Sequence, residues 1–420
     1  MKIGQITGRG ILDSRGKPTI EALVTLSDGT IASSSAPTGV TKGTYEAQPL
    51  LDGDKEHYDG LGVNQAIEVI NSTISPKLAG FEAAEQQKVD AAIIELDGTS
   101  NKSKLGANTT IAVSQAICKA AAKSSLLPLS LYLRQFISLH GQQHKIPTPM
   151  FNLIEGGRHA ENTLNFQEFL VIPATSHTLS ESLEIGVSMY QKVREYLKDN
   201  NQNILNADEG GFAPSYATNM DALRTLRTAI EMTKYGFLKD IFLGVDINAN
   251  SFMYNKKYAI KDKNGQLDQS DLMEIYQTML NDFSLVYFED PFAEEDWDGW
   301  KKIFSVIGQR ALISGDEITS TNPYRLQTAL NSGVLNAIVI KPNQIGTVTE
   351  ALAVAEMARF KQLKIVVSSR SGETDDNFIA DFAVAIDADY VKFGAPSRER
   401  IVKYNRLSAI EAELTKTKLL

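Results

Sequence analysis

Three apolar runs near the middle of the chain end at a carboxylate. Residues 241–245 (IFLGV) lead to Asp246, residues 285–288 (LVYF) to Glu289, and residues 312–315 (LISG) to Asp316. The runs show no polar alternation, so strands formed from them must be covered on both faces, as in a parallel sheet flanked by helices. Because the carboxyl ends of parallel strands meet at one edge, we expect the three acids to lie close together.

The same pattern continues downstream with cations and hydroxyls in place of acids. Lys341 follows AIVI, Ser369, Arg370 and Ser371 follow IVVS, and Lys392 follows YV. Starting from Glu289, these strand ends are about 23 to 28 residues apart, which is the length of one strand, one helix and two loops. This regularity predicts an α/β fold with a (β/α) barrel and a site on its C-terminal face.

The N-terminal third has a different character. Residues 1–36 read as strands, with Asp28-Gly29 placed to close a tight hairpin, and residues 64–79, 83–96 and 105–124 have helical periodicity. Between them, APTGVTKGTYEA is rich in turn-forming residues and reads as an exposed loop. We predict a smaller α+β domain over residues 1–137 and the barrel over 138–420, with the boundary in SLHGQQHKIPTP.

Composition excludes several classes of function. The net charge of −9 argues against a nucleic-acid-binding surface, so an anionic substrate must be held by local cations or metal ions. One cysteine, Cys118, allows no internal disulfide and fits a reducing compartment. We expect a cytoplasmic protein with no membrane association, since no secretory signal and no run of about 18 apolar residues is found.

Asp246, Glu289 and Asp316 are the candidate metal ligands. Each acid alone could simply cap the following helix. Three carboxylates on neighbouring strands would repel one another without a cation, and oxygen ligands without a cysteine or histidine cluster favour Mg²⁺. Lys341 and Lys392 either pair with carboxylates or act in catalysis, where a lowered amine pKa would produce a neutral base.

Other segments offer further candidates. NADEGGFAP presents Glu209 before paired glycines, although a plain turn explains this pattern as well. EGGRHAENTLNFQEF contains His159, and a lone histidine is usually structural. Arg370, Ser371 and the following glycine form a plausible phosphate seat. No GxGxxG motif is present, which disfavours a nicotinamide or flavin enzyme.

Taken together, the motifs resemble those of the enolase family over nearly the whole chain. They are LDSRGKPT, LDGD, SKLGAN, QEF, DEGGFAP, EDPFAEEDW, TNP, KPNQIGT, SRSGET, FIADFAVA and KYNRL, in the family's order. The resemblance implies an enolase-type (β/α)8 barrel with a smaller N-terminal α+β domain, assembled as a homodimer or higher homo-oligomer. It also implies conversion of 2-phosphoglycerate to phosphoenolpyruvate in glycolysis and gluconeogenesis, using two Mg²⁺ ions.

The resemblance assigns roles to individual residues. Asp246, Glu289 and Asp316 match the ligands of the first Mg²⁺, and Thr41 matches a serine that ligates the second. Lys341 matches the base, Glu209 the acid that assists departure of the hydroxyl group, and Glu168 its supporting carboxylate. The residues matching the substrate-binding set are His159, Gln167, Ser369, Arg370, Ser371 and Lys392.

Several positions depart from the family pattern. Ser369 stands where the family has a histidine, Glu155 replaces an asparagine, and Arg158 replaces a small residue. Ala207, Leu51, the loop APTGVTKG and the shortened GAPSRER also differ. These changes leave two alternatives open: a divergent paralogue that dehydrates a related phosphorylated or phosphonate hydroxy acid, and a binding protein that kept the fold without the catalysis.

Overall fold

In the computed structural model, which describes residues 1–40, 43–138, 144–160 and 164–417, the chain begins with an antiparallel sheet. Its strands are β1 (Ile3–Leu12), β2 (Pro18–Leu26) and β3 (Ile31–Ser35), in the order β1-β2-β3. The Asp28-Gly29 turn joins β2 to β3 as predicted, with Gly29 at φ +85° and the Asp28 carboxylate accepting the amide of Thr30. This turn needs glycine because L-residues rarely adopt that backbone conformation.

Helices cover one side of this sheet. The predicted helix at 64–79 forms as α1 (Asn64–Glu68), a π-helical segment (Val69–Ile74) and α2 (Ser75–Leu78). The other two predicted helices appear as α3 (Gln86–Asp97) and α4 (Ala107–Ser124), and α5 (Leu129–Arg134) follows. Helix α4 packs on β2 and β3, which explains why most of its residues are buried. The predicted N-terminal α+β architecture is therefore present.

The second sheet closes into a barrel. Its strand order is β4-β14-β13-β12-β11-β10-β7-β6-β5. The end strands β4 (Thr148–Pro149) and β5 (Phe151–Glu155) are separated only by Met150, so the two ends of the sheet meet. The other strands are β6 (Glu168–Pro173), β7 (Ile241–Asp246), β10 (Tyr287–Glu289), β11 (Leu312–Gly315), β12 (Ala337–Ile340), β13 (Lys364–Ser368) and β14 (Tyr390–Lys392).

One strand breaks the parallel pattern. β6 runs antiparallel to both β5 and β7, whereas the pairs from β7 through β14 to β4 are parallel. The barrel therefore begins with two strands and two helices before regular alternation sets in. Its helices are α6 (Leu179–Asp199), α7 (Asn219–Glu231), α8 (Gln269–Phe283), α9 (Trp297–Ile307), α10 (Pro323–Ser332), α11 (Pro342–Ile345), α12 (Val348–Phe360), α13 (Phe378–Ala385) and α14 (Ile401–Lys416).

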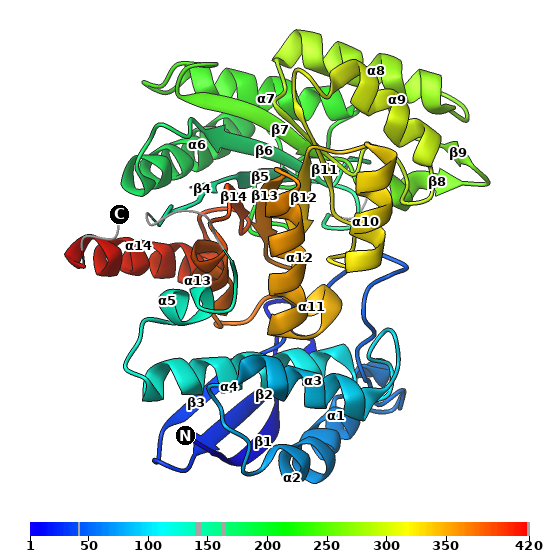
Figure 1. Ribbon diagram of the computed structural model, residues 1–420. Helices are drawn as coiled ribbons and strands as arrows, with labels where there is room; N and C mark the ends of the chain where they lie inside the picture. Colours follow the sequence, from blue (N-terminus) through cyan, green and yellow to red (C-terminus); the bar gives the residue numbers. More distant parts are fainter. Residues whose placement is uncertain (41–42, 139–143, 161–163, 418–420) are drawn as a thin grey trace.

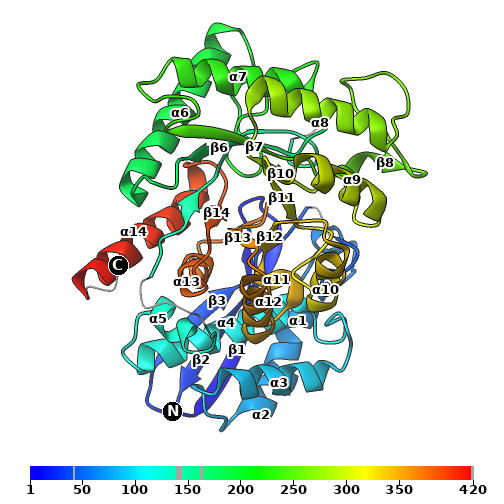
Figure 2. The ribbon, with the colours of Figure 1, turned by 45° about the horizontal axis from the view of Figure 1, so that its top comes forward.

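These helices cover the outside of the barrel, and the N-terminal unit lies against one side of it (Figures 1 and 2). Helices α6 to α8 lie outside β6 and β7 in both views, while α4 and α5 contact α11 and α13. The short elements are η1 (Tyr58–Gly60), η3 (Ala249–Phe252), β8 (Met253–Tyr254), β9 (Lys257–Tyr258) and η4 (Arg398–Arg400). The predicted domain limit between 137 and 138 remains a prediction.

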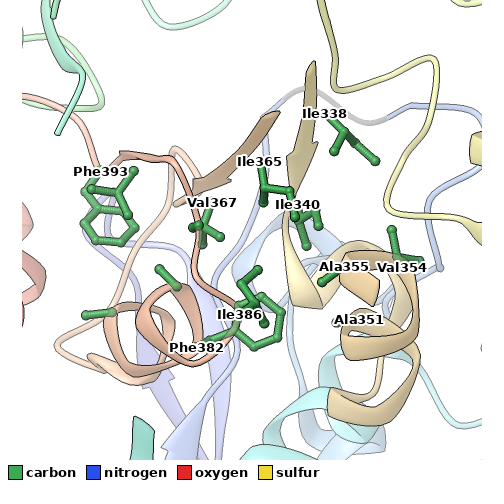
Figure 3. Close-up of a cluster of buried hydrophobic side chains, with 14 of the residues drawn as sticks. Ile338, Ile340, Ala351, Val354, Ala355, Ile365, Val367, Phe382, Ile386 and Phe393 are labelled. Atoms are coloured by element: carbon green, nitrogen blue, oxygen red, sulfur yellow. The ribbon is translucent and has the colours of Figure 1, made fainter. Parts of the chain in front are cut away.

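Strand residues alternate between two separate apolar clusters, which explains the uninterrupted apolar runs. Ile338 and Ile340 of β12 and Ile365 and Val367 of β13 belong to the large cluster that includes residues of α12 and α13 (Figure 3). Their neighbours Val339 and Val366 join a smaller cluster with Met150, Leu170, Ile172 and Tyr287 in the barrel interior. Both faces of the strands are therefore covered, as the sequence predicted.

Within the described ranges, the chain contains no helix with the length and hydrophobicity that crossing a membrane requires.

Candidate active site

Four carboxylates stand in register across neighbouring strands of the barrel. Glu155 of β5 pairs with Glu168 of β6, Glu168 pairs with Asp246 of β7, and Asp246 pairs with Glu289 of β10. We call these four residues the acidic row. All of them are buried, with at most 2% of the residue surface exposed. Burying four acids side by side is costly unless each is compensated by a cation, a proton or hydrogen bonds.

The alternation of side chains along the strands indicates that the acidic row faces the inside of the barrel. Glu168 lies two residues from Leu170 and Glu289 two residues from Tyr287, and both of these partners belong to the interior cluster. The same spacing relates Lys341 to Val339 and Lys392 to Tyr390. Side chains two residues apart in a strand share a face. The predicted acids and amines therefore gather at the C-terminal end of the barrel interior.

Lys392 compensates three members of the row. Its Nζ lies 2.8 Å from Glu168 Oε2, 2.9 Å from Asp246 Oδ2 and 2.9 Å from Glu289 Oε1. Burial lowers the pKa of Lys392, but these three carboxylates raise it well above its ordinary value. Lys392 is therefore a fixed ammonium in this arrangement, and it brings Asp246 and Glu289 around one positive charge.

The third predicted metal ligand, Asp316, follows β11 and is paired with the other buried lysine. Its Oδ2 accepts a hydrogen bond from Lys341 Nζ, and its Oδ1 accepts one from Gln344 Nε2 at 2.9 Å. Burial raises the pKa of Asp316, but Lys341 outweighs this effect and holds it below its ordinary value. Asp316 is thus an ionised ligand candidate beside the proposed base.

The donor chemistry of Asp246, Glu289 and Asp316 fits a hard divalent cation. Asp246 Oδ1 is buried and has no hydrogen-bond partner among the described residues. Burial raises the pKa of Asp246 to about 6 and that of Glu289 to about 8, so an additional positive charge would stabilise their ionised forms. Gln167, which the resemblance assigns to the substrate-binding set, directs its Nε2 to Asp246 Oδ2 at 3.3 Å, where it can orient that ligand.

A second group of possible ligands also converges. The ligand atoms of His159, Glu168 and Glu209 all lie within 4.8 Å of one another, and all three residues are buried. The imidazole nitrogen of His159 makes this set softer than the all-oxygen set, so Mg²⁺ is better matched by Asp246, Glu289 and Asp316. The group is better suited to holding and moving protons.

The three residues of this group differ in protonation state. Burial raises the pKa of Glu209, but surrounding cationic groups, among them Arg400, Lys392 and Lys341, hold it below its ordinary value. Burial instead raises the pKa of Glu168 to about 8 and lowers that of His159 to about 4. Near neutral pH the available proton is therefore on Glu168, and His159 is a neutral imidazole.

Lys341 pairs with a carboxylate, which is one of the two roles that the sequence left open for it. Burial does lower the pKa of Lys341, but the adjacent Asp316 carboxylate raises it above its ordinary value. An opposite charge in direct contact stabilises the ammonium form more than burial destabilises it.

The predicted phosphate seat joins the barrel to the N-terminal unit. Arg370 Nη1 lies 2.9 Å from Glu46 Oε2, and both side chains are buried. Ser371 Oγ accepts the amide of Val40 at 2.9 Å, so the loop before Thr41 contacts this seat directly. Thr41 itself, the predicted ligand of a second ion, lies outside the described residues.

Two of the departures from the family pattern lie at the site, and one does not. Ser369 is buried and its Oγ accepts a hydrogen bond from Arg400 Nη1 at 3.2 Å. Glu155 is the end member of the acidic row. Arg158, however, is exposed.

Sequence reasoning missed several residues that support the site. Asp290 accepts the amides of Asp316 and Glu317 at 3.0 and 2.8 Å and thereby fixes the turn after β11. Arg400 donates to the carbonyl oxygens of Asp208, Arg370 and Ser371. Glu155 was noted only as a departure from the family pattern, although it follows the mostly apolar run FNLI as the other acids follow theirs. Glu46 and Arg400 carry no comparable signal.

Comparison with known proteins agrees with these observations. The model of the family described as "Enolase, N-terminal domain" matches residues 3–133, and "Enolase, C-terminal TIM barrel domain" matches residues 143–419. A curated protein named Enolase from Ehrlichia canis (strain Jake) is 41% identical over 414 residues, covering 98% of this chain and 96% of that protein. Another protein of that name, from Acidothermus cellulolyticus, is 42% identical over 413 residues, covering 98% and 94%. On this sequence similarity and on the barrel architecture, the chain belongs to the enolase family.

Proposed function

We propose that the protein dehydrates 2-phosphoglycerate to phosphoenolpyruvate in a Mg²⁺-dependent reaction, as a hydro-lyase of glycolysis and gluconeogenesis. The acidic row facing two buried lysines at one end of the barrel is the observation that carries this proposal. The names of the curated relatives support it. The cytoplasmic location and the homo-oligomeric state remain predictions from the sequence.

Asp246, Glu289 and Asp316 would hold one Mg²⁺, and Thr41 would contribute to a second site. When bound, the metal supplies positive charge that stabilises negative charge developing on the substrate carboxylate and offsets the acids now paired with both lysines. Lys392 would bind the substrate carboxylate. Arg370 and Ser371, with neutral His159 as a further hydrogen-bonding group, would bind the phosphate.

Lys341 is the proposed base. Lys341 acts in its uncharged form, which a bound metal would favour by offsetting the Asp316 charge that now raises the pKa of Lys341. Its Nζ then removes the C2 proton, and the C2–H electron pair becomes the second bond between C2 and C3. The C3–O bond breaks, and Glu209 gives a proton to the departing hydroxyl group, which leaves as water. Glu168 has its pKa raised to about 8 by burial and lies beside Glu209, so we assign it the role of supplying that proton to Glu209.

The test is an assay of phosphoenolpyruvate formation with Mg²⁺, with an EDTA control and the Lys341→Ala variant. A matched control is Lys102→Ala. Lys102 is also buried, and its Nζ lies 2.9 Å from Glu350 Oε1, but it is outside the proposed catalytic set. We expect turnover by the native protein and by Lys102→Ala, and loss of turnover with EDTA or Lys341→Ala. Activity that survives both treatments would overturn the mechanism.

The second candidate is dehydration of a related phosphorylated or phosphonate hydroxy acid. The observation that favours it is the presence of Ser369 and Glu155 at the site itself. Comparing turnover of 2-phosphoglycerate by the native protein and by Ser369→His separates the two candidates. If the native protein turns over 2-phosphoglycerate rapidly and histidine brings no gain, 2-phosphoglycerate is the substrate. If native turnover is low and Ser369→His increases it strongly, the related acid is favoured.

A further inference from the structure

Glu155 is compensated differently from the other members of the acidic row. Glu168, Asp246 and Glu289 contact Lys392, whereas the carboxylate of Glu155 accepts two backbone amides. Its Oε2 accepts the amide of Glu209 at 3.0 Å, and its Oε1 accepts the amide of Gly211 at 2.6 Å. Both of its side-chain oxygens thus hold amides of the same turn, although burial and the Glu209 carboxylate raise the pKa of Glu155 well above its ordinary value. Glu155 therefore fastens the turn that carries the proposed acid.

The contact is part of a larger attachment of this turn to β5. The Glu155 amide donates to the Phe212 carbonyl, and the Phe212 amide donates to the Leu153 carbonyl, both at 2.9 Å. Space at the turn is also limited, because a Cβ on Gly211 would lie 2.9 Å from Glu155 Oε1. The turn brings the amides of Glu209 and Gly211 onto one carboxyl group, while the amide of Gly210 between them donates to the Ala207 carbonyl.

The peptide groups around Glu209 are held from the opposite side as well. The Glu209 carbonyl accepts the amide of Ala395 at 3.0 Å, and the Asp208 carbonyl accepts Arg400 Nη2 at 3.1 Å. Glu155 supplies the attachment on the amide side. The backbone at Glu209 is thus fixed by hydrogen bonds at both its donor and its acceptor.

From this geometry we infer that Glu155 is a positioning residue for Glu209, holding the turn through the amides of Glu209 and Gly211 so that the acid faces His159 and Glu168. This inference rests on the proposed function, in which Glu209 protonates the departing hydroxyl group. A glutamine at position 155 has the same size but one acceptor oxygen, so it can satisfy only one of the two amides. The misplaced turn then slows the step that needs Glu209 and leaves the Lys341 step intact.

The test compares Glu155→Gln with the native protein in two reactions of 2-phosphoglycerate. The first is dehydration, and the second is exchange of the C2 hydrogen with solvent deuterium, which requires Lys341 but no departure of the hydroxyl group. We expect a kcat for dehydration that is about tenfold to a hundredfold lower, with KM changed less than about threefold and C2 exchange retained. A purely structural defect would lower both reactions together, and that result would overturn the inference, as would unchanged kcat.

Asp97→Asn is the matched control. Asp97 is also buried and accepts two backbone amides, those of Thr99 at 2.9 Å and Leu105 at 2.7 Å, but it lies in the N-terminal unit. We expect this variant to lose stability while its kcat and its ratio of exchange to dehydration stay unchanged. If Asp97→Asn also lowered dehydration while retaining C2 exchange, this effect would result from a general loss of stability, and the inference would fail.

Amide hydrogen exchange of residues 207–211 tests, without any substrate, whether Glu155 holds this turn. Faster exchange of the Glu209 and Gly211 amides in Glu155→Gln supports the inference, and unchanged exchange contradicts it. If Glu155→Gln does not fold, Glu155→Asp decides on the same measurements, because a shorter carboxylate draws both acceptors away from the turn. If the native protein were inactive on 2-phosphoglycerate but its Glu209 and Gly211 amides were protected from exchange, the proposed function would be wrong while the attachment of the turn by Glu155 would stand.

Discussion

Glu46 of the N-terminal unit and Arg370 of the barrel form a buried ion pair, with Oε2 and Nη1 2.9 Å apart. Glu46 also accepts the amide of Gly43 at 3.1 Å, so the pair connects the loop near Thr41 to the proposed phosphate seat. The negative charge of Glu46 therefore lies beside the group that is expected to attract the phosphate. An incoming phosphate must share Arg370 with this carboxylate or displace it.

The first prediction concerns this competition. Glu46→Gln removes the negative charge while keeping a hydrogen-bond acceptor, so inorganic phosphate should bind several-fold more tightly, because like charges at this distance repel. The same variant should unfold at a lower temperature, since a buried charge pair has been broken. Calorimetric titration with phosphate and thermal denaturation measure the two effects. Weaker phosphate binding would contradict the competition.

The second prediction concerns pH and metal together. Burial raises the pKa of Glu168, Glu289 and Glu317 to about 8, whereas these groups ionise near pH 4.3 when unfolded, so the folded state binds more protons at neutral pH. Stability should therefore fall as pH rises from 4.3 through 8, by up to about 1.4 kcal/mol per pH unit for each group. Below pH 6.5 the lowered pKa of His159, about 4, has the opposite effect, so the window from 6.5 to 8 is the clearest.

Thermal denaturation in EDTA at pH 6.5, 7.2 and 8 checks this trend, and Mg²⁺ should raise the unfolding temperature more at pH 8 than at pH 6.5, because the metal binds the ionised acids. Stability that rises across this window in EDTA would show that the acids are ionised without the metal.

The third prediction concerns the turn after β11. Asp290 fastens the amides of Asp316 and Glu317, so Asp290→Asn should loosen the position of Asp316 and weaken Mg²⁺ binding by about tenfold to a hundredfold. Titration of the variant with Mg²⁺ measures the affinity, and Asp97→Asn serves again as the comparison. Equal Mg²⁺ affinities for Asp290→Asn and the native protein would show that Asp290 does not support the metal site.

The fourth prediction concerns Ser369. This residue is 2% exposed and its hydroxyl group is bonded to Arg400, so histidine at this position must displace its neighbours. We expect Ser369→His to lower the free energy of unfolding by about 1 to 3 kcal/mol and not to increase turnover of 2-phosphoglycerate. Denaturant unfolding and steady-state kinetics test both parts. A large gain in turnover would instead favour the related-substrate candidate.

Much of the fold followed from local pattern. The apolar runs predicted strands covered on both faces, and the clusters on either side of Val339 and Ile340 confirm this. The reversed direction of β6 could not come from periodicity, because an apolar run such as FLVI has the same pattern in either direction. Alternation is a local property, whereas strand direction depends on the path of the connecting segments.

The candidate site was predicted less completely. Strand-end position indicated Asp246, Glu289 and Lys392, whose side chains do come together. The protonation states of Glu209 and Lys341 could not be predicted, because they depend on which charge lies in contact with each group after folding. Glu46 could not be predicted at all, since its partner Arg370 is more than 300 residues away in sequence.

The acidic row has four members because β5 carries a bulge. The pairing of β5 with β6 shifts by one residue between Asn152 and Ile154, and this shift brings Glu155 opposite Glu168. With regular pairing, Ile154 would stand opposite Glu168, and an aliphatic side chain would occupy the place from which the Glu209 turn is now fastened. The one extra residue in β5 therefore sets which side chain stands opposite Glu168. Removing one residue from β5 would preserve the hydrogen-bonded ladder of the barrel, but Glu209 would lose the side chain that holds its turn.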